Sequence, residues 1–526
     1  MITWRPTTLR RLPDSGPAAD AGRPPIEAHH SGSGGGKEDS LESIVGLNTI
    51  FSADELPTTG LPSRRENGSI ATTTSPTTPR KPLGGAAAGD DDAGRRTGRL
   101  RGAIGTLALV GLVLALVGLG AKAAAAPSKL VPAAGPDRFP GWLSGPLHGI
   151  LTGIPGGGYE GLLLGICACY AVVLASARAL GPRTLWAGIL AAHLAVLLGP
   201  PLLSADVFGY LDFARLGVLH SLDPYTHTAA AATGDAIYPY LGWHDVSTPY
   251  GPLFTLLTYS LVPLGIAGGI WALKVLAVVT SLATIVLVWR SAGRRGLARG
   301  PAIALLGLNP LLLVFAVGGA HNDTLLGLLV AAGLVAVLDR RDVAGPATLV
   351  GAIAVKASAG LALPFALIAA HRRDRGRQAV LAVLVALAAI LLIALIGFGG
   401  EISGITGSLR GQQQLVAIHS LPSFVSRLLG LDRLDGTVRT GFEVGFVAML
   451  IGCLVHAWRH SERWLEAYGW TAVGLLCATA WLLPWYALWA LLPASLSADR
   501  RLRGAVLAIC AYLVATRLPL AYPVLG

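Results

Sequence analysis

The chain has 526 residues, of which 53% are hydrophobic and 13% are charged, and its net charge is +11. Soluble domains contain about 25% charged residues, so this composition excludes an ordinary soluble enzyme and indicates a polytopic membrane protein. Residues 1–100 hold 12 basic and 12 acidic residues, so the whole positive excess lies in the rest of the chain, in loops between apolar segments. Basic residues in such loops set the orientation of a membrane protein, and this interpretation is favoured over nucleic-acid binding.

The first 100 residues differ from the rest of the chain. They are rich in proline, glycine, serine, threonine and charge, and they lack an apolar periodicity. Such a segment buries too little apolar surface to offset the entropy of ordering, so we predict a disordered tail over residues 1–100. Nothing at its start has the apolar core of a signal peptide. Four arginines precede the first apolar segment, and the positive-inside rule therefore predicts a cytoplasmic N-terminus.

Residues 101–526 are predicted to form one all-α transmembrane domain. Arginine clusters between its apolar segments predict the cytoplasmic loops, which leaves the long loop 204–252 outside. Two segments, 254–266 and 345–370, do not fit a simple alternation, so we expect about 11–13 helices. The other apolar segments that are candidates to cross the hydrocarbon core lie near residues 102–120, 159–179, 184–203, 270–289, 302–318, 324–338, 377–398, 441–458, 467–483, 485–498 and 504–523.

Segment 345–370 contains Lys356, followed by Ser358, Gly360 and Pro364. This pattern predicts a broken helix that lines a polar cavity. An ionisable residue inside a membrane segment is a functional candidate by default, and a polyprenyl phosphate headgroup is a natural partner for an ammonium group. We expect Lys356 to be the only charge deep in the membrane.

The outer loop 204–252 combines five aspartates and three histidines with one arginine. A loop of this kind at a membrane surface suits an enzyme that acts on a lipid-linked polar substrate. Asp206 directly follows an apolar segment, where neighbours and partial burial tune a carboxyl pKa, so we predict that Asp206 is the general base for an acceptor hydroxyl. A helix N-cap in Ser204-Ala205-Asp206 is the alternative.

Four more residues of this loop are candidates for substrate binding. Asp212 falls on a different helix face from Asp206 if this stretch is helical. Asp223 and Tyr225 lie in a turn signal, where Asp223 either orients substrate or only forms the turn. Tyr250 either stacks on a sugar ring or anchors the chain at the membrane interface.

The triplet His321-Asn322-Asp323 lies at the outer end of an apolar segment. Three consecutive polar groups are costly there unless they are used, so we predict that they bind a phosphate or sugar hydroxyls beside Asp206. Capping of the next helix by Asn322 and Asp323 is the alternative. A divalent metal ion is compatible with these residues, but no ligand spacing indicates one, and we expect no metal and no cofactor.

Three later residues complete the set of substrate-binding candidates. Arg410 and His419 lie in the predicted outer loop 399–440, against the positive-inside tendency, which suggests an anionic partner. Attraction to anionic lipid headgroups is the alternative. Trp485, in Pro484-Trp485-Tyr486, either lines a carbohydrate groove or belongs to the aromatic belt of the membrane interface.

Several motifs follow one another between about residues 180 and 500: LLSADVFGYLDFARLGVLHSLDPY, TPYGPLFTLL, LNPLLLVFAVGGAHNDTLLGLLVAAGLVA, AVKASAGLALPF and LLPWYALWALLP. In these motifs the chain resembles actinobacterial membrane mannosyltransferases of the GT-C superfamily. That group uses polyprenyl-phosphate-mannose and includes the α-1,6-mannosyltransferases of lipomannan assembly and the related GT87 group.

The resemblance implies a multi-pass plasma-membrane enzyme of GT-C architecture with a long outer catalytic loop. It further implies inverting transfer of a hexose, mannose in the group it resembles, from a polyprenyl-phosphate donor to a glycolipid or glycan acceptor. The acidic base of GT-C enzymes matches Asp206, their His-Asn-Asp element matches residues 321–323, and the lysine of a broken helix matches Lys356. In agreement, the sequence contains no P-loop motif and no soluble domain of the nucleotide-binding type.

Two other functions remain open from the sequence. A transporter or flippase of lipid-linked sugars would favour inverted repeats and charges near the middle of the membrane, and no clear internal repeat is visible. A non-catalytic partner in a complex that assembles the cell envelope would tolerate the loss of Asp206.

Overall fold

The computed structural model describes residues 87–125, 131, 140–146 and 158–518, and all regular secondary structure in these residues is helical. The chain divides into residues 1–86 and a second unit from residue 87 onward, which is the unit described below. Most of the predicted disordered tail lies outside the described residues. Its predicted boundary at residue 100 is wrong, because α1 (Ala87–Ala124) already begins at Ala87.

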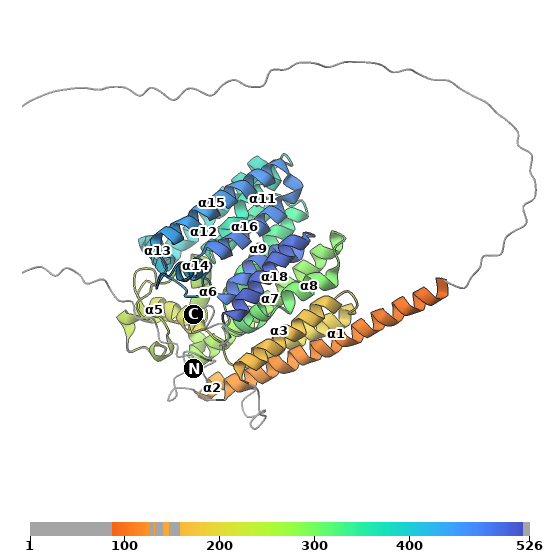
Figure 1. Cartoon of the computed structure of the whole chain (residues 1–526). Helices are drawn as coiled ribbons and strands as arrows, with labels where there is room; N and C mark the ends of the chain where they lie inside the picture. Colours follow the sequence, from red (N-terminus) through yellow and green to blue (C-terminus); the bar gives the residue numbers. More distant parts are fainter. Residues whose placement is uncertain (1–86, 126–130, 132–139, 147–157, 519–526) are drawn as a thin grey trace, which may run out of the picture. The chain divides into compact units, whose positions relative to one another are not determined.

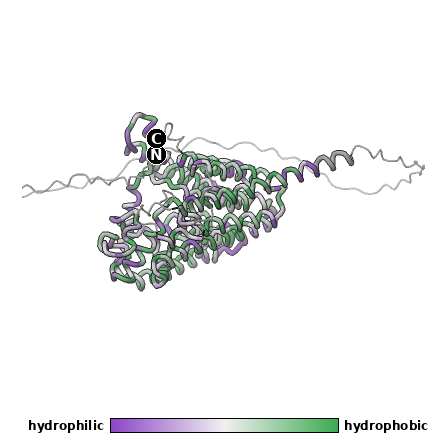
Figure 2. The backbone as a smooth tube through the Cα atoms, turned by 90° about the horizontal axis from the view of Figure 1, so that it is seen from below, coloured by the Kyte–Doolittle hydropathy of each residue, from purple (hydrophilic) through white to green (hydrophobic). Residues whose placement is uncertain are grey.

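The second unit contains long helices that lie side by side (Figure 1). At one edge α1 packs on α3 and α4, and at the other α15 packs on α16, with α7 and α9 between them. Hydrophobic residues run along most of these helices (Figure 2). The bounds of the longer elements are α3 (Tyr159–Ser176), α4 (Pro182–Leu198), α5 (Asp206–His220), α6 (Pro252–Tyr259), α7 (Gly265–Arg294), α8 (Arg299–Gly307), η4 (Leu311–Val317), α9 (Asp323–Leu338), α10 (Ala344–Ile353), η5 (Ala357–Ala362), α11 (Leu363–His371), α12 (Gly376–Phe398), α13 (Ile405–Gln414), α14 (Leu421–Leu428), α15 (Gly436–Arg459), α16 (Trp464–Ala478), α17 (Ala487–Leu496) and α18 (Arg500–Ala515).

The membrane character of the chain is confirmed by its apolar helices. Within the described residues, 5 helical stretches are long and apolar enough to cross a membrane, and the count is 6 if the bent pair α8 and η4 forms one span. Shorter apolar helices such as α4, α9 and α10 lie beside them. Segment 254–266 is not a separate span, because α6 and α7 join in one candidate span, Pro252–Arg294. The total of 11–13 crossings stays a prediction.

Two helices are interrupted at one place in the fold. The predicted broken helix is confirmed: α10 ends at Ile353, Lys356 has an extended backbone, and η5 and α11 continue the segment. The other interruption is η4, a π-helical stretch that bends by 44° from α8 and leads to His321. Interrupted helices leave backbone groups unpaired at membrane depth, and they are tolerated where they line a polar site.

The turn at Gly251 packs directly on the break in the first of these helices. The Gly251 amide donates to the Val355 carbonyl at 3.0 Å, and the Leu253 amide donates to the Ala354 carbonyl at 3.0 Å. A Cβ atom at Gly251 would lie 2.2 Å from the Ala354 oxygen. The close approach therefore requires glycine, and it brings Tyr250 beside the broken helix.

We expect Gly251→Ala to destabilise the protein by about 1–3 kcal/mol, the usual cost of forcing an extra methyl into a packed contact. The matched control is Gly441→Ala, because nothing lies within 4 Å of a Cβ at Gly441 in α15. The measurement is the temperature at which half of the purified protein remains monodisperse in detergent. Equal midpoints for the two variants would contradict the steric argument.

Candidate active site

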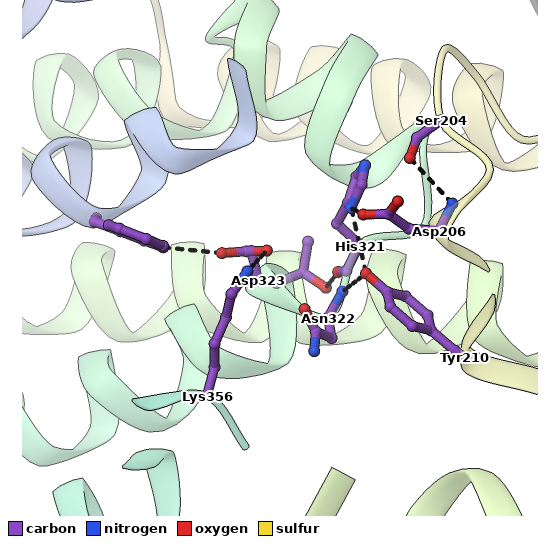
Figure 3. Close-up of polar contacts among 9 residues, drawn as sticks. Ser204, Asp206, Tyr210, His321, Asn322, Asp323 and Lys356 are labelled. Carbon is purple, nitrogen blue, oxygen red and sulfur yellow. Dashed lines mark hydrogen bonds and ion pairs between the residues drawn. The ribbon is translucent and has the colours of Figure 1, made fainter. Parts of the chain in front are cut away.

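Four separate segments of the chain meet in one polar cluster, shown in part in Figure 3. They are the start of α5 with Asp206, the turn before α9 with residues 321–323, the helix break at Lys356, and the segment 485–489 around the start of α17. The sequence separates the first and last of these segments by nearly 280 residues. The fold therefore brings together the principal predicted site residues.

The turns that carry Asp206 and His321 are locked to each other through the backbone. The Leu202 amide donates to the Gly318 carbonyl at 2.8 Å. Leu203 and Ala320 both have left-handed backbone conformations, with φ of 61° and 53°. Such conformations are strained for residues with a Cβ, and they persist where the surrounding structure holds them in place. The two strained turns precede the two residues predicted to do chemistry.

Asp206 and His321 are in direct contact. Asp206 Oδ2 lies 3.4 Å from His321 Nδ1, and the Tyr210 hydroxyl lies 3.3 Å from the same nitrogen. Burial raises the pKa of the Asp206 carboxyl to about 6, an effect that the nearby Lys356 opposes. Burial, followed by repulsion from Lys356, holds the pKa of His321 well below its ordinary value. At neutral pH the cluster therefore pairs an ionised carboxylate of raised basicity with a neutral imidazole.

Asp323 and Lys356 form the second pair of the cluster. Lys356 Nζ donates to Asp323 Oδ2 at 2.8 Å, and Trp489 Nε1 donates to Asp323 Oδ1 at 2.8 Å. Asp323 is fully buried, whereas the Lys356 side chain is 16% exposed. The ammonium group also lies 4.9 Å from the centre of the Tyr486 ring, where a cation–π attraction adds to the ion pair.

The side chains of Asp206, Asn322 and Asp323 do not cap their helices, and at the start of α5 Ser204 accepts the first amide instead. The side chain of Asp206 makes no capping bond at the start of α5, where the Asp206 amide instead donates to Ser204 Oγ at 3.1 Å. Asn322 occupies the N-cap position of α9 without a side-chain capping bond. Both oxygens of Asp323 are used by Lys356 and Trp489. The carboxylates therefore face the cluster and do not serve the local helix ends.

Aromatic side chains enclose the cluster. His321 stacks on Trp485 with ring centres 3.7 Å apart and planes 20° from parallel. Tyr250 packs edge-on against Tyr210 at 5.0 Å, which fits its predicted place at the site. The buried Tyr225 hydroxyl donates to the Tyr250 carbonyl at 2.9 Å, so Tyr225 supports the Tyr250 turn. For Trp485 the contact with His321 favours the site interpretation over the membrane belt.

Four predicted residues are placed elsewhere. Asp212 is buried in α5, where burial and then the neighbouring Asp235 raise its pKa to about 7. Asp223 accepts from the Tyr225 amide at 2.8 Å, which is the turn alternative. Arg410 lies exposed on α13, and the backbone oxygen of His419 accepts from Tyr512 at 2.9 Å. Substrate binding by these four residues stays a prediction.

Tyr210 and Trp489 are not among the residues predicted from the sequence, and Tyr486 enters there only as the neighbour of Trp485. Tyr486 and Trp489 are three residues apart in α17 and its entry, and the aromatic spacing in LLPWYALWALLP was the available signal. The expectation that Lys356 is the only deep charge is wrong. Lys274 is 1% exposed in the middle of α7, and its ammonium group donates to the Val196 carbonyl at 3.0 Å. It thereby satisfies a carbonyl near the C-terminal end of α4, just before the strained turn to Asp206.

No group of three or more His, Cys, Asp or Glu side chains with a geometry for a metal ion occurs among residues 87–125, 131, 140–146 and 158–518. The expectation that the chain uses no metal and no other cofactor stays a prediction. The organic groups that are present are a carboxylate base, a neutral imidazole, an ammonium group and a wall of aromatic rings. This set can remove a proton, hold an anion and contact a sugar ring.

The part of the chain that matches a known family contains three of the four segments of the cluster. Residues 102–372 match the family model described as "Alpha-(1->6)-mannopyranosyltransferase, N-terminal domain", a range that contains Asp206, residues 321–323 and Lys356. No solved structure matches the chain.

Curated relatives carry the corresponding name. Alpha-(1->6)-mannopyranosyltransferase A of Corynebacterium glutamicum is 28% identical over 340 residues, which are 58% of this chain and 68% of that protein. The protein of the same name from Mycobacterium tuberculosis is 30% identical over 335 residues, 58% of this chain and 64% of that protein. A probable alpha-(1->6)-mannopyranosyltransferase of Mycolicibacterium smegmatis is 28% identical over 373 residues, 60% of this chain and 65% of that protein. The matches thus span about two thirds of these relatives, and because the family model matches more than half of the chain, the chain belongs to the family of alpha-(1->6)-mannopyranosyltransferases.

Proposed function

We propose that the chain transfers mannose, with inversion, from a polyprenyl-phosphate donor to a glycolipid or glycan acceptor at the outer face of the plasma membrane. Family membership makes it a membrane glycosyltransferase that moves mannose. The observation that carries the finer proposal is the placement of Asp206 and Lys356 around one turn, residues 321–323. A base at one end and a cation at the other suit a sugar whose leaving group is an anion.

In the proposed reaction an acceptor hydroxyl oxygen attacks the anomeric carbon of the donor. Asp206 takes the hydroxyl proton, and the bond between the anomeric carbon and the phosphate oxygen breaks with its electron pair going to the phosphate. A carboxyl pKa of about 6 suits this step, because a general base is most effective when its pKa lies near the working pH. Attack from the face opposite the leaving group gives inversion.

Lys356 is the proposed partner of the phosphate. A lysine has three N–H donors, and Asp323 accepts one of them, so others are available to phosphate oxygens. The partial exposure of Lys356 keeps its ammonium group accessible while the broken helix fixes its position. A fixed cation that meets developing negative charge in a site of low polarity stabilises the transition state strongly.

The proposed location follows from charge and apolarity. The arginine clusters of the interhelical loops predict a cytoplasmic side, and loop 204–252 then lies on the opposite side of the membrane. The polyprenyl chain of the donor would contact the apolar helix surfaces, so the partners are membrane lipid, the lipid-linked sugar and the acceptor glycan. The transporter alternative gains no support from the family of the chain.

We expect Asp206→Asn to lower transfer of radiolabelled mannose from polyprenyl-phosphate-mannose by about 100- to 10,000-fold, the usual contribution of a general base. The assay uses membranes that contain equal amounts of each variant. The control is Asp245→Asn, which removes an exposed aspartate of the same loop and should leave transfer unchanged. Equal transfer by wild type and Asp206→Asn would exclude Asp206 as the base.

The acid side of the pH profile provides a second test. A base works only when it is unprotonated, so kcat/KM should fall about tenfold per pH unit below about pH 6, the pKa given to Asp206 by burial. Lys356 lowers this pKa, so in Lys356→Gln the acid limb should move to higher pH. A profile that is flat between pH 5 and 7, or an unchanged limb in the variant, would contradict the assignment.

The buried ion pair predicts an asymmetry between its two partners. Lys356→Met leaves the fully buried Asp323 carboxylate uncompensated and should destabilise the protein by about 3 kcal/mol. Asp323→Asn should cost less, because Lys356 is partly exposed and keeps the Tyr486 and Trp489 rings as partners. Detergent melting curves of both variants check the order. Lys356→Met should also lower transfer by about 100- to 1,000-fold, whereas a phosphate site elsewhere would leave transfer near the wild-type rate.

A further inference from the structure

The side chain of Asn322 lies in the cluster and has no role in the proposed chemistry. It is 3% exposed, and among the described residues neither its Oδ1 nor its Nδ2 has a hydrogen-bond partner. An asparagine at an N-cap normally bonds to its own helix, but Asn322 makes no such bond to α9. A buried amide without partners loses the hydration of a donor and of an acceptor without compensation.

The contrast with Asn309 shows that this fold can satisfy a buried amide. Asn309 is also fully buried, yet its Oδ1 accepts from the Leu311 amide at 2.9 Å and its Nδ2 donates to the Tyr170 hydroxyl at 3.3 Å. Asn309 therefore has a structural role that Asn322 lacks. An apolar residue of the same size at position 322 would avoid the cost of the unpaired amide. The amide is therefore available for a ligand.

The position of Asn322 defines which part of a ligand it meets. Its neighbours in sequence contact the two ends of the site: His321 lies 3.4 Å from Asp206, and Asp323 lies 2.8 Å from Lys356. Figure 3 shows the Asn322 amide between the side chains of Lys356 and Tyr210. Under the proposed function, the phosphate of the donor lies at Lys356 and the anomeric carbon lies near Asp206. The anomeric carbon is bonded to the phosphate through one oxygen atom, so the sugar ring starts between these two groups, and the hydroxyls nearest to that carbon lie beside Asn322.

We propose that Asn322 is the residue that recognises the transferred sugar, by binding two adjacent hydroxyl groups of the hexose. This inference rests on the proposed function. One hydroxyl accepts from Nδ2 and its neighbour donates to Oδ1, so a vicinal diol satisfies both atoms at once. The neutral amide does not compete with Lys356 for the phosphate. A site built to bond a substrate hydroxyl discriminates strongly against an analogue that lacks it, because the buried protein group is then left unpaired.

The test combines enzyme variants with donor analogues. The value of kcat/KM is measured for wild type and Asn322→Leu with polyprenyl-phosphate-mannose and with its 2-, 3- and 4-deoxy analogues. In wild type, removal of either hydroxyl that pairs with the amide should lower kcat/KM at least about 100-fold. In Asn322→Leu the intact donor should already show a similar loss, and removal of the same hydroxyls should have little further effect.

Stability separates recognition from a structural role. Asn322→Leu should melt in detergent at the same temperature as wild type or higher, because it removes an unpaired amide. The matched Asn309→Leu should melt lower, because it breaks the hydrogen bonds of Asn309 with Tyr170, Cys510 and Leu311. The shift of the melting temperature on addition of donor should shrink in Asn322→Leu only.

The outcomes keep the two proposals apart. Transfer by wild type that is insensitive to all three deoxy positions, or losses in Asn322→Leu that simply multiply with those of the analogues, would overturn recognition by Asn322 while the proposed function stands. Neither transfer nor donor binding by folded wild type would overturn the proposed function, and the recognition role with it.

Discussion

The ion pair between Lys356 and Asp323 is the interaction on which the arrangement of the site depends. It joins the break in the α10–α11 segment to the start of α9, and Trp489 extends it to α17 through the second carboxylate oxygen. A carboxylate that is fully buried in an apolar bundle is stable only with its charge compensated and its oxygens bonded. The α10–α11 segment, α9 and α17 therefore cannot shift independently without leaving a charge unpaired. His321 and Asn322, which directly precede α9, are held in place by the same ion pair.

The strained turns at Leu203 and Ala320 also depend on bonds between separate segments. Each costs conformational energy, and each lies shortly before a predicted site residue, Asp206 or His321. Lys274 and the Leu202–Gly318 bond supply the compensation, since they satisfy carbonyls that the end of α4 and the end of η4 leave open. The site thus consists of irregular backbone whose polar groups are paired across segments, which is the condition for irregular structure among membrane helices.

Much of the fold and site is visible in the sequence because it is encoded locally. Apolar length predicts the helices, and the Lys356, Gly360 and Pro364 pattern predicts the break that the structure contains. Polar residues next to apolar segments mark Asp206 and residues 321–323. The pairing of Asp323 with Trp489 spans 166 residues, and no periodicity encodes such a contact. Lys274 lies within the predicted span 270–289, but its bond to the Val196 carbonyl joins residues 78 apart, which no local pattern encodes. Asp212 lies in α5 with Asp206 and neighbours Asp235, and its different helix face follows from helical spacing.

The charges of the cluster link binding of the donor to the basicity of Asp206. Among the described side chains at the site, Asp206 and Asp323 carry negative charge when ionised, Lys356 is the cation, and His321 is neutral. A phosphodiester donor adds another negative charge beside Lys356. The ammonium group lowers the pKa of Asp206 in the free protein, and a bound phosphate would offset that influence. Under the proposed function, donor binding therefore makes Asp206 a stronger base at the moment when the acceptor hydroxyl must lose its proton. The negative charge of the bound phosphate also disfavours the ionised form of Asp206. Donor binding therefore raises the lowest pH at which the Asp206 carboxyl is unprotonated.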